Sequence, residues 1–166
     1  MPEVDLIVKI LGQIRTHNGK PCELQILSPY NDQLVAIRRA IEAEFKSGRL
    51  SHMQKEPFTL SYETRMGATV DQFQGSEADI VIVSLVRNNA LVPWKSIGFL
   101  KEPNRMNVLL SRARHKLIIV GSWDFFDSRC DEYTGEDQEY AYIGRMMNCM
   151  KEAERDNKLK RTAIKR

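Results

Sequence analysis

The sequence has no hydrophobic run of the length that a membrane helix requires, and it is poor in cysteine. No apolar stretch approaches the ~20 residues that cross a bilayer, and the N-terminus carries no signal-peptide pattern. We therefore expect an intracellular protein, cytoplasmic or nuclear, with no membrane partner. The three cysteines are widely spaced and match neither a zinc ligand set nor a disulfide framework: Cys22, Cys130 and Cys149. Reduced thiols are expected, and no metal site is predicted.

The sequence also lacks the parts of a complete nucleoside triphosphate site. The P-loop pattern Gly-x-x-x-x-Gly-Lys-Ser/Thr is missing, because the one Gly-Lys pair, Gly19-Lys20, has Ile14 five positions before the glycine. No predicted strand ends in a pair of carboxylates suited to magnesium. The three histidines are scattered and form no nucleophile–base arrangement: His17, His52 and His115. The chain cannot hold a triphosphate alone, which indicates half of a shared site.

The size and composition are those of one globular domain. The chain has 166 residues, of which 42% are hydrophobic and 28% charged. We predict that the domain covers residues 1–150. Basic residues outnumber acidic ones in residues 151–166 by more than the net charge of +3 of the whole chain, so the rest is close to neutral. This basic end is either a solvated or frayed helix end or an arm that attracts phosphate groups.

Short apolar strands alternate with amphipathic helices along the chain. This alternation predicts a three-layer α/β fold, in which helices cover both faces of a mainly parallel sheet. Four helices are predicted: residues 3–14, a helix from a cap at Asn31 or Asp32 to Gly48, residues 104–114 and about 137–156. The predicted strands are residues 23–27, 58–62, 80–86 and 117–120. Residues 49–57 are predicted to be a surface connection and residues 88–103 a long connection.

The polar run TVDQFQGSEAD, residues 69–79, leads directly into the apolar strand at 80–86. Ligands gather at strand ends in such sheets. Gly75 lets backbone N–H groups approach an anion closely, and Thr69 offers a hydroxyl. Glu77 is suited to accept from ribose hydroxyls or to act on a metal ion. These features suit a nucleotide or a nucleic-acid backbone, and a capped strand-to-helix turn explains them equally well.

A second polar cluster, NRMNVLLSRAR, occupies residues 104–114 before the strand at 117–120. Arg112 and Arg114 are two positions apart, so they cannot share one face of a helix. One of them is suited to reach a ligand while the other braces the fold or a partner domain, because arginine makes bidentate contacts with phosphate. The alternative is a pair of solvated arginines at a helix end, where cations are favoured.

Together these segments resemble the second, C-terminal RecA-like domain of superfamily 1 helicases of the nonsense-decay-factor type. ILSPYNDQ, residues 26–33, is similar to helicase motif IV. TVDQFQGSEADIVIVSLVR, residues 69–87, is similar to motif V, and GFLKEPNRMNVLLSRARHKLIIVG, residues 98–121, to motif VI. The resemblance covers almost the whole chain and implies a RecA-like fold of the P-loop NTPase type without its own P-loop. Motif IV is weakly specific, whereas V and VI together are highly specific.

The resemblance implies roles for individual residues. Arg112 would be the catalytic arginine finger on the γ-phosphate of ATP. Ser111 stands where the family usually has threonine, and it keeps the hydroxyl. ATP and Mg²⁺ would be bound mainly by the first domain of the family and met from this side by Gln74, Gly75, Glu77 and Arg114, of which Arg114 would support the site or contact the other domain. The nucleic-acid track would include Ser28, Pro29, Tyr30, Thr69, Val70 and Asp71.

The same resemblance implies a mechanism and partners. Two RecA-like domains would close on ATP and alternate their grip on a single strand of DNA or RNA, usually moving 5′ to 3′ in this family. Because the Walker A and B motifs belong to the first domain, we expect this chain to be part of a longer protein and inactive alone. The alternative is a non-catalytic RecA-like module that binds nucleic acid or a protein. Trp123, Phe125 and Phe126 are expected in the core or on a docking face rather than as a base-stacking platform.

Overall fold

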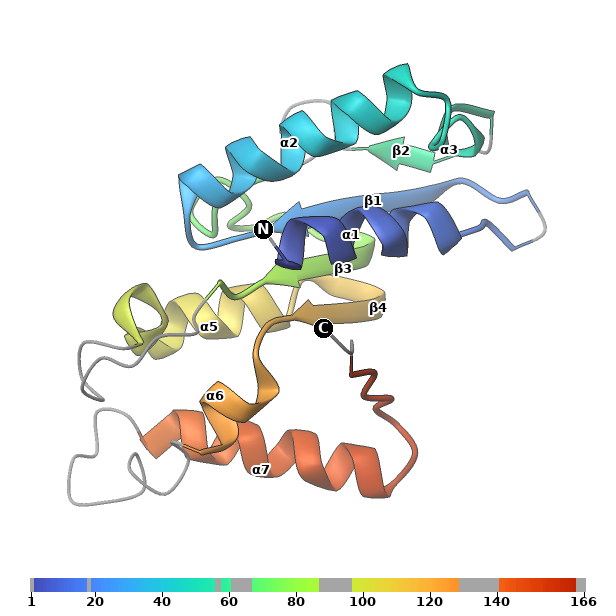
Figure 1. Cartoon of the computed structure of the whole chain (residues 1–166). Coiled ribbons are helices and arrows are strands. Elements are labelled where there is room, and N and C mark those ends of the chain that lie inside the picture. Colours follow the sequence, from blue (N-terminus) through green and yellow to red (C-terminus); the bar gives the residue numbers. More distant parts are fainter. Residues whose placement is uncertain are drawn as a thin grey trace. The chain divides into compact units, whose positions relative to one another are not determined.

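Four parallel strands form the sheet that positions the candidate site (Figure 1). The structure is a computed structural model that describes residues 2–17, 19–55, 58–60, 67–86, 97–128 and 141–163. The strand order is β2-β1-β3-β4, and each neighbouring pair is parallel. The strands are β1 (Cys22–Leu27), β2 (Phe58–Leu60), β3 (Ala78–Ser84) and β4 (Ala113–Val120). The predicted α/β fold with a parallel sheet is confirmed.

The chain divides into two compact units, which are described separately. Unit 1 consists of Met1–Val86 and Glu102–Gly121 and contains the whole sheet. Unit 2 consists of Arg87–Lys101 and Ser122–Arg166. The predicted domain boundary at residue 150 stays a prediction.

Helices α1 (Pro2–Gln13) and α2 (Asn31–Lys46) lie side by side and cover one face of the sheet in unit 1 (Figure 1). Their apolar residues recur every three to four positions, so each helix turns one apolar stripe toward the strands. Val81 and Val83, which alternation places on the opposite face of β3, are also fully buried. Both faces are therefore covered. The core under α1 and α2 includes Ile7, Leu11, Leu24, Ile26, Ile37, Ile41, Ile82 and Val120.

Helix α2 starts differently from the prediction and ends as predicted. Tyr30 is its N-cap and no side chain caps the helix, so the expected cap at Asn31 or Asp32 is wrong. The helix follows β1 after a short turn in which the Tyr30 N–H donates to the Ser28 hydroxyl at 3.4 Å, and this turn fixes the start. The helix stops before Gly48, which adopts a positive φ of 79°, as a terminating glycine does.

Residues 49–55 are more than the surface connection that the sequence predicted. They include the short helix α3 (His52–Lys55). Leu50 and Met53 are 1% and 3% exposed and join the core under α1 and α2. The prediction of a surface connection was wrong for this part of the chain. Leu50 and Met53 are separated by polar residues and are too few to show a helical periodicity.

Helix α5 (Pro103–Leu110) is shorter and β4 longer than predicted. Ser111 is the C-cap of α5, and β4 begins at Ala113 instead of Leu117. The prediction that one helix carries Arg112, Ala113 and Arg114 is therefore wrong. The first residues of β4 escaped the prediction because Ala113 is followed by three polar, exposed residues, as suits the outer strand of the described sheet.

Unit 2 contains η2 (Gly98–Lys101), α6 (Trp123–Asp127) and α7 (Ala141–Arg155). Phe125 and Phe126 are 6% and 4% exposed. Their rings meet edge to face with 5.0 Å between the centroids. These two aromatics are core residues, as expected, and no platform for stacking bases. The predicted residues 61–62 of β2 and 137–140 of α7 lie outside the described residues.

The chain reverses direction directly after α7. Asn157 adopts a positive φ of 58°, and the N–H of Lys158 donates to the carbonyl of Ala153 at 2.8 Å, as in a Schellman motif. The guanidinium of Arg161 then lies over the ring of Trp123, 4.6 Å from its centroid. These contacts order residues 156–161, for which the sequence left a frayed helix end and a phosphate-attracting arm open.

Candidate functional site

Parallel pairing of β3 with β4 brings the end of the polar run 69–79, within motif V, to the arginines of motif VI. The N–H of Ala78 donates to the carbonyl of Arg112 at 3.1 Å, and Ala78 is the partner of Ala113 in the strand register. Glu77 therefore lies one residue from the hydrogen bond that Arg112 accepts. The two clusters that the sequence singled out meet at the amino-terminal edge of these strands.

Residues 69–77, the segment before β3, run from the carboxyl ends of the strands to their amino ends. Ala68 forms a bridge with Leu27, at the carboxyl end of β1. Val83 is also level with Leu27, and Ala78 lies five residues earlier on β3, which corresponds to about 16 Å along the strand. Thr69 therefore starts near the carboxyl edge, and Glu77 ends at the amino edge. The predicted nucleic-acid residue and the predicted ATP residue are at opposite ends of one segment.

The beginning of this segment forms a capping box. The N–H of Thr69 donates to the side-chain oxygen of Gln72 at 3.0 Å, and the N–H of Gln72 donates to the Thr69 hydroxyl at 3.4 Å. Val70 is buried and Asp71 is exposed, where it pairs with Arg105 at 3.5 Å. Thr69 is thus half-buried, and the N–H of Gln72 orients its hydroxyl.

The end of the segment is open to solvent. Gln74, Gly75 and Glu77 are exposed, and Gly75 has a φ of 84° with no atom within 4 Å of the place that a Cβ would take. Glycine is required here by the backbone conformation and not by crowding. Within the described part of the chain, the Glu77 carboxylate has no hydrogen bond or ion pair. An exposed acid beside an open glycine turn is free to meet a ligand.

The side chain of Arg112 is held against the end of α5. Its Nε donates to the carbonyl of Val108 at 3.2 Å, and an Nη donates to the hydroxyl of Ser111 at 2.9 Å. The hydroxyl that Ser111 shares with the usual threonine of the family therefore contacts Arg112 directly. Arg112 is half-buried, which limits the positions that its guanidinium samples.

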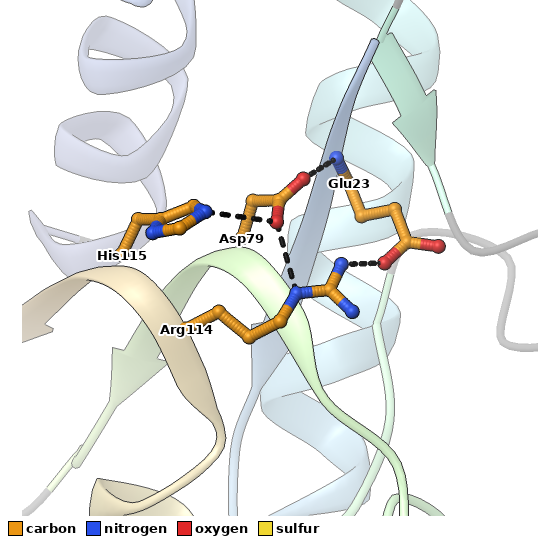
Figure 2. Close-up of polar contacts among 4 residues, drawn as sticks. All are labelled: Glu23, Asp79, Arg114 and His115. Atoms are coloured by element: carbon orange, nitrogen blue, oxygen red, sulfur yellow. Dashed lines mark hydrogen bonds and ion pairs between the residues drawn. The ribbon is translucent and has the colours of Figure 1, made fainter.

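Arg114 lies in a cluster of charges at the same edge (Figure 2). Its Nε donates to Asp79 at 2.9 Å, and an Nη contacts the carboxylate of Glu23. The second oxygen of Asp79 accepts the backbone N–H of Glu23 at 2.9 Å. That N–H and the Arg114 guanidinium hold the pKa of the Asp79 carboxyl below its usual 3.8. His115 lies 3.6 Å from Asp79 and completes the cluster.

The three motif IV residues behave differently from one another. Ser28 and Pro29 are buried, and the Ser28 hydroxyl donates to the carbonyl of Ser84 at 3.1 Å. In this conformation Ser28 has no exposed surface for a phosphate, and it supports the Tyr30 backbone instead. Tyr30 is half-buried at the start of α2. The N–H of Ser28 donates to the carbonyl of Ala68 at 3.3 Å, which puts this turn next to Thr69.

Two groups of residues near the site were missed from the sequence. Glu3 contacts Ser84 and Val86 at the carboxyl end of β3, and Gln33 donates to Ser84 at 3.0 Å. No sequence pattern signals a contact between residues so far apart. Asp79 stood within motif V, and its position one residue after the start of β3 was the available signal.

The described residues contain neither a cluster of metal ligands nor a helix that could span a membrane. No group of three or more histidine, cysteine, aspartate or glutamate side chains is placed there to hold a metal ion. No described helix has the length and apolar character that crossing a membrane requires. Of the cysteines in the described ranges, Cys22 and Cys149 are free thiols.

Comparison with known proteins shows the family of the chain. The model of the family described as an AAA domain, AAA_12, matches residues 1–124, which include all three motifs. The chain belongs to this family. Its relatives include helicases and regulators of nonsense transcripts, so the expected kind of domain, a superfamily 1 helicase domain of the nonsense-decay-factor type, is confirmed.

Three relatives illustrate the extent of the similarity. Regulator of nonsense transcripts 1 of Dictyostelium discoideum is 36% identical over 120 residues, which are 72% of this chain and 8% of that protein. DNA polymerase alpha-associated DNA helicase A of Saccharomyces cerevisiae is 32% identical over 72% of this chain and 15% of that protein. The ATP-dependent helicase NAM7 of Saccharomyces cerevisiae is 31% identical over 69% of this chain and 10% of that protein. The chain thus spans a small part of each relative.

Proposed function

We propose that this chain is the second motor domain of an ATP-dependent helicase or translocase that acts on DNA or RNA. The observation that carries the proposal is the 3.1 Å hydrogen bond from Ala78 to Arg112, which joins the polar run 69–79 of motif V to motif VI. The family match supports a helicase domain, and the ATP dependence of the relative NAM7 supports the nucleotide.

The residues near this hydrogen bond fit one side of an ATP molecule. Gly75 offers an exposed turn with open space around it, and the Glu77 carboxylate has no partner among the described residues. The backbone of Arg112 lies one residue from Glu77, at Ala78, and we assign the guanidinium of Arg112 the role of arginine finger. When bound, ATP supplies the phosphoryl group that is transferred to water. Gln74, Gly75 and Glu77 would orient the nucleotide, while Mg²⁺ would be held mainly by the first domain.

The opposite end of the segment fits a nucleic-acid phosphate. The Thr69 hydroxyl and the backbone at Val70 and Asp71 would bind it, with Tyr30 nearby on the turn after β1. Residues 69–77 form one short connection between this end and Glu77. A shift of Glu77 on domain closure would therefore be passed to Thr69 along the backbone of this one segment, which is a route for coupling hydrolysis to grip.

The role of Arg112 is tested by replacing it in a protein that carries both motor domains. We expect Arg112→Ala to lower kcat for ATP hydrolysis by about 10³-fold or more, because an arginine finger stabilises charge in the transition state. ATP binding, measured as a Kd, should change little. Arg39→Ala, which removes an exposed arginine on α2, is the matched control and should hydrolyse ATP normally. Rapid hydrolysis by Arg112→Ala would refute the assignment.

The isolated 166-residue chain should not hydrolyse ATP at a measurable rate, because it has no P-loop. A non-catalytic binding module shares this expectation, so another observation must separate the two. If the sequence of the first domain contains a P-loop followed by an Asp-Glu pair, the motor-domain proposal is favoured. If it lacks these motifs, and Arg112→Ala leaves the biological function intact, the non-catalytic binding module is favoured.

A further inference from the structure

The first residues of β4 follow an irregular path past β3. Ala78 pairs with Ala113, but Ile80 pairs with Lys116, so β4 uses three steps where β3 uses two. This is a β-bulge, which inserts an extra residue and bends the strand that carries it. Arg114 and His115 are the residues within the bulge. Ala113, the residue after Arg112, still pairs with Ala78, and the regular register is lost at the next two residues.

Both bulge side chains contact the same carboxylate. The Nε of Arg114 donates to Oδ1 of Asp79 at 2.9 Å, and the Nε2 of His115 lies 3.6 Å from the same oxygen (Figure 2). The other oxygen of Asp79 accepts the N–H of Glu23 on β1 at 2.9 Å. The Asp79 side chain thus connects three strands at one point, and it is 20% exposed.

Arg112 is fixed from two directions, and Asp79 acts on one of them. From α5, the side chain of Arg112 is held by Val108 and Ser111. From β3, its carbonyl is held by the N–H of Ala78, the residue next to Asp79. If the bulge loosens, the second constraint loosens with it, because Arg114 is only two residues from Arg112.

We propose that Asp79 is a positioning residue for Arg112: its carboxylate fastens the bulge at Arg114 and His115 and so fixes the corner at which Arg112 leaves α5. The inference rests on the proposed function. In this proposal, Asp79 of motif V positions Arg112 of motif VI and does not itself contact ATP. The ion pairs are partly exposed, so their effect is on geometry more than on overall stability.

The test is Asp79→Asn in a protein that carries both motor domains. We expect kcat for ATP hydrolysis to fall by about 10- to 100-fold, because a displacement of about 1 Å at a catalytic group has effects of this size. The KM and Kd for ATP should stay close to those of the unchanged protein. Glu23→Gln is the control: it weakens an outer contact of Arg114 but leaves the Glu23 N–H and the Asp79 carboxylate in place, and it should retain most of the kcat.

A double variant separates positioning from general damage. In slow single-turnover assays followed over hours, Asp79→Asn should add nothing to the loss caused by Arg112→Ala, since both act through one group. If Asp79→Asn lowers the rate of ATP hydrolysis by the same factor with Arg112 present and with Arg112 replaced by alanine, the positioning role is overturned. A normal kcat for Asp79→Asn, with Arg112→Ala inactive, would also overturn it. A normal kcat for Arg112→Ala would instead overturn the proposed function itself.

Discussion

The carboxylate of Glu3, in the first turn of α1, accepts the backbone N–H of Val86 at 3.2 Å. Val86 lies two residues after the end of β3 and has a positive φ of 65°, a left-handed conformation that is rare for a β-branched residue. The Ser84 hydroxyl donates to the same carboxylate, and Gln33 donates to that hydroxyl at 3.0 Å. A partly buried acid near the N-terminus therefore holds a strained backbone at the carboxyl edge of the sheet.

Replacing Glu3 tests the electrostatic part of this contact. Burial raises the pKa of Glu3 above its usual 4.5, and the hydrogen bonds from Ser84 and Val86 oppose the rise only in part. The ionised form is thus disfavoured in the folded chain. This cost is present above the raised pKa and disappears as the pH falls toward 4.5. Glu3→Gln removes the charge and keeps an acceptor, so it should raise the free energy of unfolding near pH 7.

The measurement is denaturant unfolding of the 166-residue chain between pH 7 and pH 4.5, with Glu42→Gln as the control for the loss of one exposed negative charge. The unchanged chain and the control should gain stability from Glu3 as the pH falls through this interval. Glu3→Gln should lack that gain. If Glu3→Gln is less stable than the unchanged chain at pH 7, and its free energy of unfolding rises by the same amount as the pH falls to 4.5, the charge of Glu3 stabilises the fold.

Much of the fold followed from apolar runs and helical spacing, and the errors have local causes. The run at 80–86 identified β3, but the observed strand is Ala78–Ser84, because its first residues pair with the Arg112–Ala113 corner. The apolar content of the segment carries no information about that partner. For β4, three exposed polar residues precede Leu117, so the start of the strand had no hydrophobic signal.

The candidate site was predictable only where a motif named its residues. Motifs V and VI identified Glu77 and Arg112, and parallel pairing in the structure puts their backbones together. Local sequence could not predict that Glu3 reaches Val86, because neither residue belongs to a pattern with the other. The role of Asp79 depends on a bulge in β4, which is a property of two strands in register and of neither one alone.

The positive φ of Gly75 gives a prediction about motif V. At 84°, an L-residue is strained even though open space surrounds the glycine. We expect Gly75→Ala to lower the free energy of unfolding by about 1 kcal/mol, since the left-handed region costs an L-residue about this much. Gly12→Ala is the matched control: Gly12 also has no neighbour within 4 Å but lies in α1, where alanine should stabilise by roughly 0.5–1 kcal/mol. Denaturant unfolding of both variants measures the difference, and equal shifts of one sign would contradict the strained turn.

Asp79 also gives a prediction about stability that is independent of catalysis. Its pKa is lowered by the Glu23 N–H and by Arg114, so its stabilising effect is present above the usual 3.8 and is lost as the pH falls through the lower folded value. Asp79→Asn should destabilise the chain at pH 7 by only about 1 kcal/mol, because the ion pairs are partly exposed to water. The difference between the two chains, followed by denaturant unfolding, should shrink below pH 3.8. A loss of several kcal/mol would indicate a general structural role in place of a positioning role.

The turn after α7 gives a prediction for unit 2. Asn157 has a φ of 58°, and the N–H groups of Lys158 and Leu159 donate to the Ala153 carbonyl at 2.8 Å and 3.0 Å. Asn157→Gly keeps this conformation accessible, whereas Asn157→Ala opposes it by about 1 kcal/mol. In amide hydrogen exchange, the two N–H groups should exchange about five times faster in the alanine variant than in the glycine variant. Arg161 should also leave Trp123 more often in the alanine variant, because the same turn returns the chain to α6. Equal exchange in the two variants would mean that the turn is held by the Arg161 contact and not by its backbone.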